Sequence, residues 1–237
     1  KIKKLNPNCS DIAYLVGLLN GDGHLQIKRN KYGNIKSGSA SFYSKYIDEI
    51  DNLDKRFQSL FGIKGTRYID NSYKRKRHKI FFCSNRLSVF LNSKGVIDGN
   101  KTNKEYYVPD WIMNGKKGIK SSFLRGIFSA EGFITKSREN NKIRYRIGIS
   151  QYKREDLANQ CKKYVGQIKY LVGYFGIKCS NVYPHSKNKK RKDGIYTKGF
   201  VFTFGSRYIP IFNDYIGFDN KHKQERIKEF LSIKNNF

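Results

Sequence analysis

One short pattern occurs twice in this chain: an apolar, helix-like run that ends in a small residue, one carboxylate and a glycine. The first copy reads YLVGLLNGDG from Tyr14, and the second reads FLRGIFSAEG from Phe123. The two acids, Asp22 and Glu131, are 109 residues apart. An internal repeat with this period predicts a molecule made of two similar halves.

Small residues recur at every fourth position in both copies: Ala13, Gly17 and Gly21 in the first, and Ser122, Gly126 and Ala130 in the second. Residues four apart share one face of a helix. A glycine inside a helix costs about 1 kcal/mol relative to alanine, whereas a stripe of small residues lets two helix backbones approach closely. The stripes therefore predict that the two helices pack against each other. The alternative is that the glycines only accommodate packing within each half.

Parallel packing of these helices would bring Asp22 and Glu131 together at the helix carboxyl ends. The helix dipole opposes a carboxylate at that end, and two neighbouring carboxylates raise each other's pKa. A divalent cation would remove both costs, and the unpaired carbonyls of Gly21 and Ala130 would add the oxygen ligands that Mg²⁺ prefers. We therefore expect a symmetric metal site. The alternative is that each acid merely caps a neighbouring amide.

The segments between and after the two motifs repeat in the order helix, strand, strand, helix, strand, strand, helix. "LFGIKG" follows the first long helix, and "YFGIKC" follows the second. We expect an N-terminal half at 1–94, a linker at 95–120 and a C-terminal half at 121–237. The predicted helices cover 11–22, 45–61, 86–92, 121–131, 154–175, 206–215 and 223–233, with strands near 178–184 and 196–204 and a break at Gly217.

Charge indicates the class of partner. The chain has 48 Lys and Arg against 19 Asp and Glu, a net charge of +29, which a polyanionic partner would offset. Aromatic residues make up 15% of the chain, more than a disordered basic tail carries. An anionic membrane is the rival partner, but no basic amphipathic helix and no membrane-spanning run stands out. These features predict a folded nucleic-acid-binding protein.

The four cysteines, Cys9, Cys83, Cys161 and Cys179, are scattered without a close pair. This spacing favours buried thiols in a reducing, intracellular compartment over a zinc site or a disulfide framework. The richness in Lys, Asn, Ile, Tyr and Phe resembles the product of an A+T-rich genome, which suggests an organellar gene of a mitochondrion or chloroplast.

The two copies resemble the paired motifs of a single-chain LAGLIDADG homing endonuclease. The element order, the spacing of the halves and a "VPDWI" linker extend this resemblance to nearly the whole chain. It implies an α+β fold of two pseudo-symmetric αββαββα repeats, with antiparallel sheets forming a DNA-binding saddle and the motif helices at the interface. The matching letters are Leu15, Gly17, Leu18, Asp22 and Gly23, then Leu124, Gly126, Ala130 and Gly132, with Glu131 as a common replacement.

The resemblance implies a monomeric enzyme of intron homing that makes a double-strand break across the minor groove and leaves short 3′ overhangs. Metal held by Asp22 and Glu131 would activate water against one phosphodiester on each strand. Mg²⁺ is the expected ion, Mn²⁺ would also serve, and Ca²⁺ would support binding without cleavage. Polar residues around the water and a lysine near each acid complete the family's site; the candidates are Gln151, Ser44, Lys101 and Lys221.

Polar residues alternating along the strands are candidates for reading base edges in the major groove. Two basic loops are candidates for gripping phosphate at the ends of the target. The strand candidates are His24, Gln26, Lys28, Asn30, Arg67, Tyr68, Phe133, Thr135, Ser137, Arg144 and Arg146. The loop candidates are Lys74, Arg75, Lys76, Arg77, Lys189, Lys190, Arg191 and Lys192.

Two other functions use the same scaffold. Some members of the family bind their host intron RNA as splicing cofactors, or maturases, and others could be silent DNA-binding modules. The presence of two mutually repelling acids argues against a silent module but not against a maturase. No splicing-domain signature is visible at either end, which favours an intron over an intein as the host.

Overall fold

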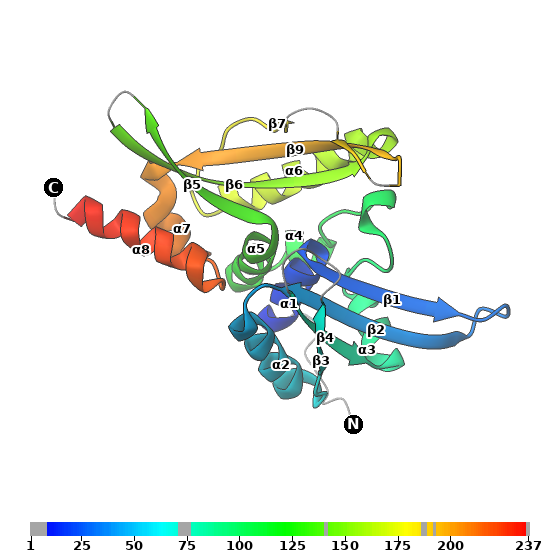
Figure 1. Cartoon of the computed structure of the whole chain (residues 1–237). Helices are drawn as coiled ribbons and strands as arrows, with labels where there is room; N and C mark the ends of the chain where they lie inside the picture. The colour runs from blue at the N-terminus through cyan, green and yellow to red at the C-terminus, as the bar shows by residue number, and fades with distance from the viewer. Residues whose placement is uncertain (1–8, 71–76, 140–141, 186–188, 192, 236–237) are drawn as a thin grey trace.

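The computed structural model describes residues 9–70, 77–139, 142–185, 189–191 and 193–235. Two helices, α1 (Ser10–Gly21) and α5 (Lys117–Glu131), lie side by side at the centre of the molecule, with one half of the chain built on each (Figure 1). One continuous hydrophobic core runs through both halves. Among the residues described, no helix combines the length and the hydrophobicity that a bilayer crossing requires.

The first half is a four-stranded antiparallel sheet in the order β1-β2-β4-β3, covered by helices. Ala40, Phe42, Ile80 and Phe82 alternate into the core, because successive side chains of a strand point to opposite faces. The elements are β1 (Gly23–Arg29), β2 (Ile35–Ser44), α2 (Ile47–Phe61), β3 (Thr66–Asp70), β4 (Arg77–Cys83) and α3 (Asn85–Ser93).

The second half repeats this arrangement after α5. Its sheet has the order β5-β6-β9, and two short strands, β7 and β8, pair with the outer side of β9. Tyr145, Ile147 and Ile149 alternate into the core. The elements are β5 (Gly132–Glu139), β6 (Lys142–Arg154), η2 (Glu155–Leu157), α6 (Ala158–Gly173), β7 (Tyr183–Pro184), β8 (Lys189–Lys190), β9 (Tyr196–Gly205), η3 (Ser206–Tyr208), α7 (Ile209–Tyr215) and α8 (Lys221–Asn235).

The segment between the halves is held against the first half. It contains a 3₁₀ turn, η1 (Lys101–Asn103), and a short helix, α4 (Asp110–Met113). The amide N–H of Ile27 donates to the side chain of Asp98 at 2.8 Å, and the indole of Trp111 donates to the carbonyl of Lys94 at 3.1 Å. These contacts fix the path of the chain from α3 to α5.

The predicted element order is confirmed, and the differences lie at element ends. Helix α5 begins at Lys117, inside the predicted linker, and the predicted strand at 178–184 is present only at Tyr183–Pro184. At Ser180 the backbone N–H still donates to the carbonyl of Thr203 at 2.8 Å, but the N–H of Thr203 donates to the Ser180 hydroxyl at 3.0 Å instead of to a backbone carbonyl, so the regular ladder is not formed there. Gly217, with φ of 64°, separates α7 from α8 as predicted.

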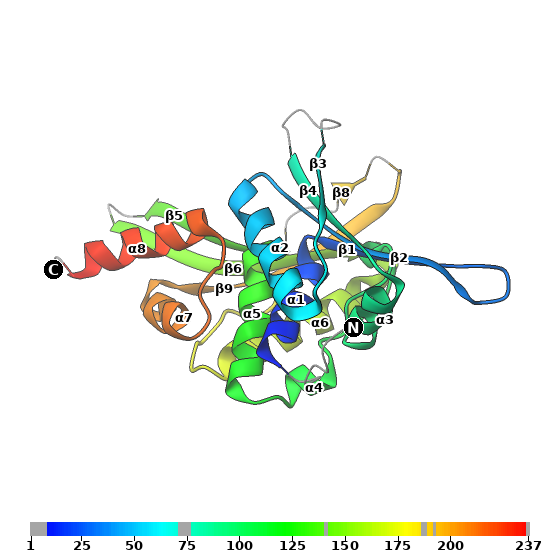
Figure 2. The ribbon, with the colours of Figure 1, turned by 90° about the horizontal axis from the view of Figure 1, so that it is seen from below.

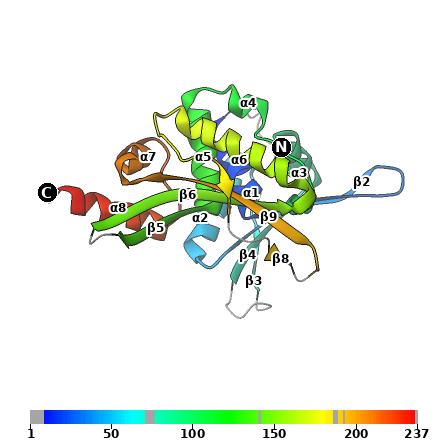
Figure 3. The same cartoon turned by 90° about the horizontal axis from the view of Figure 1, so that it is seen from above.

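The hairpins point outward from the central helices. Figures 2 and 3 show the ends of β3, β4 and β8 on the side of the molecule opposite α4. The loop that joins β1 to β2 lies at one end of the molecule, and α8 lies with β5 at the other end. The carboxyl ends of α1 and α5 lead directly into β1 and β5, so the acids stand where the two sheets begin.

Candidate active site at the ends of the motif helices

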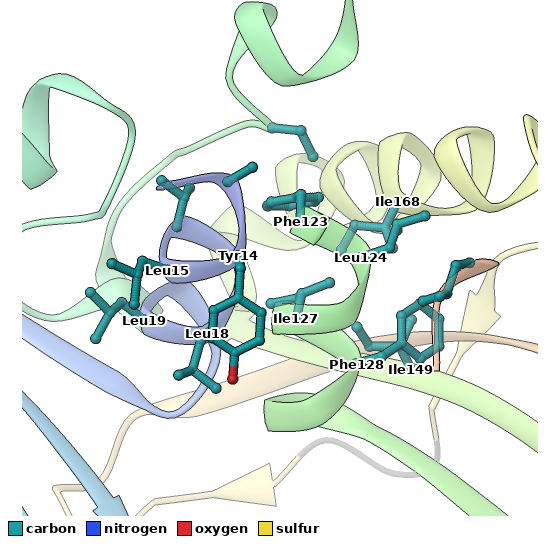
Figure 4. Packing of buried hydrophobic residues seen from close by; sticks show 14 of the residues in the cluster. Tyr14, Leu15, Leu18, Leu19, Phe123, Leu124, Ile127, Phe128, Ile149 and Ile168 are labelled. Carbon is teal, nitrogen blue, oxygen red and sulfur yellow. The ribbon is translucent and has the colours of Figure 1, made fainter. Parts of the chain in front are cut away.

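The two motif helices touch backbone to backbone. A methyl group at Gly17 would lie 2.3 Å from the carbonyl oxygen of Phe123, and one at Gly126 would lie 2.2 Å from the carbonyl oxygen of Tyr14. The contact is symmetric, since Tyr14 and Phe123 occupy the same position in the two copies. Figure 4 shows Tyr14, Phe123 and Ile127 between the helices, while Leu15 and Leu19 lie on the far side of α1 and Leu124 and Phe128 lie on the far side of α5. The predicted helix seam is confirmed.

The seam brings the two acids to one place. A methyl group at Gly21 would lie 2.3 Å from the Cβ of Ala130 and 3.1 Å from the Cγ of Glu131. The pKa of Glu131 is raised to about 7, chiefly by burial and also by the charge of Asp22, against the opposing effect of Lys101 and Lys223. Burial likewise raises the pKa of Asp22, whose side chain is open to solvent on one side yet crowded by protein on the others. The two carboxylates are therefore close enough for electrostatic repulsion between them.

A lysine caps the carboxyl end of each motif helix. The ammonium of Lys101, on η1, donates to the carbonyls of Leu19 at 3.1 Å, of Gly23 at 2.7 Å and of Gly21. Burial lowers the pKa of Lys101 to about 8, while the charges of Glu131 and Asp22 oppose that shift. The cation lies at the negative end of the helix dipole.

Lys223, on α8, makes the matching contacts in the second half. Its ammonium donates to the carbonyls of Phe128 at 3.4 Å, Ser129 at 2.6 Å and Ala130 at 3.2 Å. The prediction of Lys221 for this position is therefore wrong: Lys221 is exposed, and Lys223 reaches the helix end. Two residues along a helix correspond to a turn of about 200°, so the two lysines of "DNKHKQ" point in opposite directions.

The predicted carbonyl ligands are already in use. The carbonyl of Gly21 accepts from Lys101 and that of Ala130 accepts from Lys223. An ammonium and a metal ion would compete for these oxygens, which leaves Asp22 and Glu131 as the principal ligand candidates. No group of three or more His, Cys, Asp or Glu that could hold a metal occurs among the described residues. Two carboxylates suit Mg²⁺, which keeps several waters and takes further ligands from phosphate.

Gln151 lies at the acids, as expected, near the end of β6. Its buried amide approaches Glu131 closely enough to lower the pKa of that acid. The Nε2 atom nevertheless makes no hydrogen bond of good geometry within the described part of the chain. A buried donor without a partner beside a carboxylate is a suitable place for a water or a phosphate oxygen.

Ser44 occupies the corresponding position in the first half, but its hydroxyl is engaged. It donates to the Oε2 of Glu49 at 2.5 Å, and the other carboxylate oxygen of Glu49 accepts from Asn220. Burial raises the pKa of Glu49, and Asp22 contributes to the rise. Glu49 is thus a third acid near the site, in the first turn of α2, and it lines a cavity of about 600 Å³ with Asp22 and Lys223. The one signal in the sequence that indicates a role for Glu49 at the site is its position five residues after Ser44.

The solvent-facing side of the sheets carries most of the predicted DNA contacts. His24, Gln26 and Lys28 alternate outward on β1. On the second sheet, Thr135 lies opposite Arg146, and Ser137 lies opposite Arg144. Phe133 lies on the same side of β5 as Thr135, and the side chain of Tyr68 on β3 is 55% exposed.

Two of the strand candidates have partners within the protein. Arg67 points toward α2, where it pairs with Asp51 at 2.5 Å and Asp54 at 2.9 Å. Asn30 lies in the turn after β1, where its side-chain oxygen accepts from two backbone N–H groups. Sequence reasoning also missed Lys79 of β4, which lies opposite Tyr68 and over the ring of Tyr43 at 5.0 Å. Counting alternately from the buried Ile80 would have found it.

The basic loops are described in part. Lys74, Arg75, Lys76 and Lys192 lie outside the described residues, as does the side chain of Lys189. Arg77 lines the cavity beside Asp22, and its charge lowers the pKa of that acid. Lys190 lies over the ring of Tyr196 at 5.6 Å, and Arg191 pairs with Asp193 at 3.2 Å.

Sequence comparison finds relatives of this chain inside larger proteins. The tRNA-splicing ligase RtcB of Pyrococcus abyssi is 28% identical over 181 residues, 73% of this chain and 19% of the relative. The replication factor C small subunit of Methanocaldococcus jannaschii is 33% identical over 64% of this chain and 8% of the relative. RNA polymerase subunit Rpo1N of that organism is 24% identical over 93% of this chain and 17% of the relative. The chain therefore spans less than a quarter of each of these proteins.

Three solved structures resemble the chain over most of its length. I-DmoI in complex with DNA and Mn has a TM-score of 0.56 and 18% identity, and the match covers 89% of this chain and 97% of that one. The homing endonuclease I-WcaI bound to its DNA recognition sequence has a TM-score of 0.56 and 16% identity, with 94% of this chain and 89% of that one covered. Full-length DUF199/WhiA from Thermatoga maritima has a TM-score of 0.53 and 14% identity, with 97% of this chain and 61% of that one covered. At these identities the likeness establishes the fold.

Family comparison agrees with the structure. Residues 118–217, which include the second motif, match the family of LAGLIDADG-like domains. The first motif, although outside that match, packs against the second in the symmetric seam described above. Residues 118–217 thus match a LAGLIDADG-like domain, and the chain as a whole has the fold of the homing endonucleases I-DmoI and I-WcaI.

Proposed function

We propose that this chain is a site-specific DNA endonuclease that cuts both strands by metal-dependent hydrolysis. The observation that carries the proposal is the pair of acids, Asp22 and Glu131, on abutting helix ends. Each helix end also bears a lysine ammonium. Two structures of the same fold hold DNA, one of them with Mn, which supports a nucleic acid and a divalent cation as ligands.

The acids fit a divalent cation. Their mutual repulsion and burial disfavour two negative charges in the absence of a cation. When bound there, Mg²⁺ or Mn²⁺ would lower the pKa of a water and neutralise charge on the phosphate. Ca²⁺, which is larger and accepts looser geometry, is expected to support binding without cleavage.

The surrounding residues have separate roles in this proposal. Lys101 and Lys223 place positive charge beside the acids, where they would stabilise the charge that develops on the phosphate. Gln151 would orient the attacking water through its unpartnered Nε2. In the first half, Ser44 is tied to Glu49, so this carboxylate would orient the water instead. The two strands would then be cut by unequal sites.

The sheets supply the recognition surface. Outward residues such as Gln26, Lys28, Arg144 and Arg146 are suited to base edges in the major groove. The acids, between the two sheets, would then face the minor groove, and staggered cuts there leave 3′ overhangs. We propose that one chain, with its two halves, covers the whole target as a monomer.

The relatives support a homing role. An RNA ligase, a replication factor and an RNA polymerase subunit have unrelated names, yet each contains a segment similar to this chain. A segment shared by otherwise unrelated proteins is the pattern that an inserted mobile element leaves. We infer that this chain acts on DNA for the spread of such an element, whether its own host is an intron or an intein.

A cleavage selection on a randomised duplex library, with Mg²⁺ and with Ca²⁺, tests the proposal. The wild type should cut in Mg²⁺ and only bind in Ca²⁺. Asp22→Asn and Glu131→Gln should abolish cleavage and keep DNA affinity, while Asp48→Asn, an exposed acid of α2, should leave both unchanged. Cleavage by the double variant D22N/E131Q would refute the assignment of the site.

The alternative is a maturase, which assists splicing of intron RNA. It would bind a structured RNA in the absence of divalent-dependent cleavage, and its activity would not depend on Asp22 or Glu131. A splicing assay with the double variant D22N/E131Q therefore separates the two functions, because only the nuclease needs both acids.

A further inference from the structure

A lysine lies wholly inside the protein next to the candidate site. Lys153, on β6 two residues after Gln151, is 1% exposed. Its ammonium donates to the carbonyl of Lys101 at 3.2 Å and to that of Lys104, and it lies 3.6 Å from the ring centre of Tyr106. A buried charge is costly unless it is fully partnered. These contacts satisfy the ammonium with two carbonyls and one aromatic face.

The partners of Lys153 form the turn that carries Lys101. The carbonyls of Lys101 and Lys104 lie at either end of η1, and the ammonium of Lys101 reaches from this turn to the end of α1. The turn belongs to the linker after the first half, whereas Lys153 belongs to the second half. The buried ammonium therefore ties the support of Lys101 to the opposite sheet.

The other half contains a counterpart made of different chemistry. Ser44 and Gln151 occupy equivalent positions in β2 and β6, since Phe42 and Ile149 pair with the glycines that follow the two acids, so Tyr46 is equivalent to Lys153. The ring of Tyr46 lies 4.9 Å from that of His222, the residue before Lys223. Lys153 in β6 and Tyr46, two residues after β2, thus each contact the segment that carries the other half's lysine, once through an ammonium and once through an aromatic ring.

We propose that Lys153 is a positioning residue whose buried ammonium holds the η1 turn and so keeps Lys101 on the end of α1. Tyr46 has the matching role for Lys223, through His222. The consequence for catalysis rests on the function proposed above: each support serves one lysine, and loss of one support slows the cutting of one strand. The supports differ chemically, so they can be removed separately.

The first experiment measures the position of Lys101 without any cleavage. Lysine acylation by an N-hydroxysuccinimide acetate probe, read by mass spectrometry, is compared between the wild type, Lys153→Gln and Tyr46→Leu. Glutamine removes the charge and keeps a donor for the carbonyls. We expect Lys101, but not Lys223, to become more reactive in Lys153→Gln, and the reverse in Tyr46→Leu. Unchanged reactivity of Lys101 in folded Lys153→Gln would overturn the proposal.

The second experiment measures strand-specific cutting on a plasmid that carries the target. Lys153→Gln should accumulate nicked circles because one strand is cut up to about 100-fold more slowly, with DNA affinity unchanged. Lys101→Met should give the same product, and the double variant should add little to it, because both changes act on one group. If Lys153→Gln fails to fold, Lys153→Arg retains a cation and should cut both strands with a smaller difference between them; a loss equal to that of Lys101→Met would contradict the proposal. A wild type that does not cut DNA would refute the nuclease and leave the acylation result to decide this inference.

Discussion

Gly17 and Gly126 must be glycines because the backbone of the partner helix leaves no room for a side chain, and not because of their own backbone conformation. Each would place a Cβ within 2.3 Å of a backbone carbonyl of the partner helix, and backbone atoms of two packed helices cannot move aside as a flexible side chain can. The small-residue stripe is therefore what sets the distance between the helices, and with it the distance between Asp22 and Glu131.

Gly126→Ala tests this constraint. We expect the change to lower the free energy of unfolding by about 2 kcal/mol or more, because overpacking a tight interior forces backbone shifts. Gly166→Ala is the matched control: it is also inside a helix, but a methyl group there would meet nothing within 4 Å. The control should gain up to about 1 kcal/mol from helix propensity. Urea unfolding of both variants measures the difference, and equal stabilities would refute the tight seam.

Lys153 makes a second prediction at this scale, through the pH dependence of stability. Burial lowers its pKa from 10.5 to about 8 in the folded protein, although the charges of Cys161 and Glu105 oppose the shift. Between these two values the unfolded chain holds a proton that the folded chain has lost. The free energy of unfolding therefore gains a contribution that rises with pH, by up to about 1.4 kcal/mol per pH unit.

Lys153→Gln should lack this contribution. The difference in unfolding free energy, wild type minus variant, should then increase between about pH 8 and pH 10, since all other groups are shared and largely cancel. Urea titrations of both proteins across this range provide the measurement. Parallel pH curves would show that the ammonium of Lys153 is not desolvated in the folded state.

At the scale of helices and strands, the repeat predicted the fold well because it is a local pattern written twice. Periodicity gave the order of the elements, and the stripes gave the seam. The repeat could not show which face of α8 points toward the end of α5, so it could not distinguish Lys221 from Lys223. Nor could it show that Arg67 has acids of α2 as partners, since that pairing depends on how the helix crosses the sheet.

The face occupied by Arg67 leads to a prediction that separates structure from recognition. Asp54 is 1% exposed and accepts from Arg67 and from the N–H of Gly65. Arg67→Met should lower the stability of the protein, because it leaves a buried carboxylate without its cation, and should leave DNA sequence preference unchanged. Arg144→Met, on the outward face of β6, should do the opposite. Thermal unfolding and binding to a target library distinguish the two, and altered base preference in Arg67→Met would restore Arg67 as a DNA contact.

At the scale of the whole molecule, basic residues such as Lys28, Arg144 and Arg146 lie on the sheets, while helices α1 and α5 hold the two halves together. Tyr14 of α1 donates to Asp219 of the second half at 2.7 Å, and the guanidinium of Arg56 lies over the ring of Tyr14 at 4.2 Å. These contacts join the two halves at the side of the seam. If the halves keep this arrangement on binding, little conformational entropy is lost when many phosphates are contacted at once.

The dependence of DNA affinity on salt tests this arrangement. A net charge of +29 leaves ample lysine and arginine for phosphate contacts, and neutralisation of roughly ten phosphates gives a slope of log affinity against log salt near −9. Replacing Lys190 by Gln should reduce the magnitude of the slope by about 0.9 if it contacts one phosphate. Lys221→Gln, at the start of α8, provides a comparison away from the hairpins. Fluorescence anisotropy with a labelled duplex gives the slope, and a value near zero would mean that the basic surface does not bind the DNA backbone.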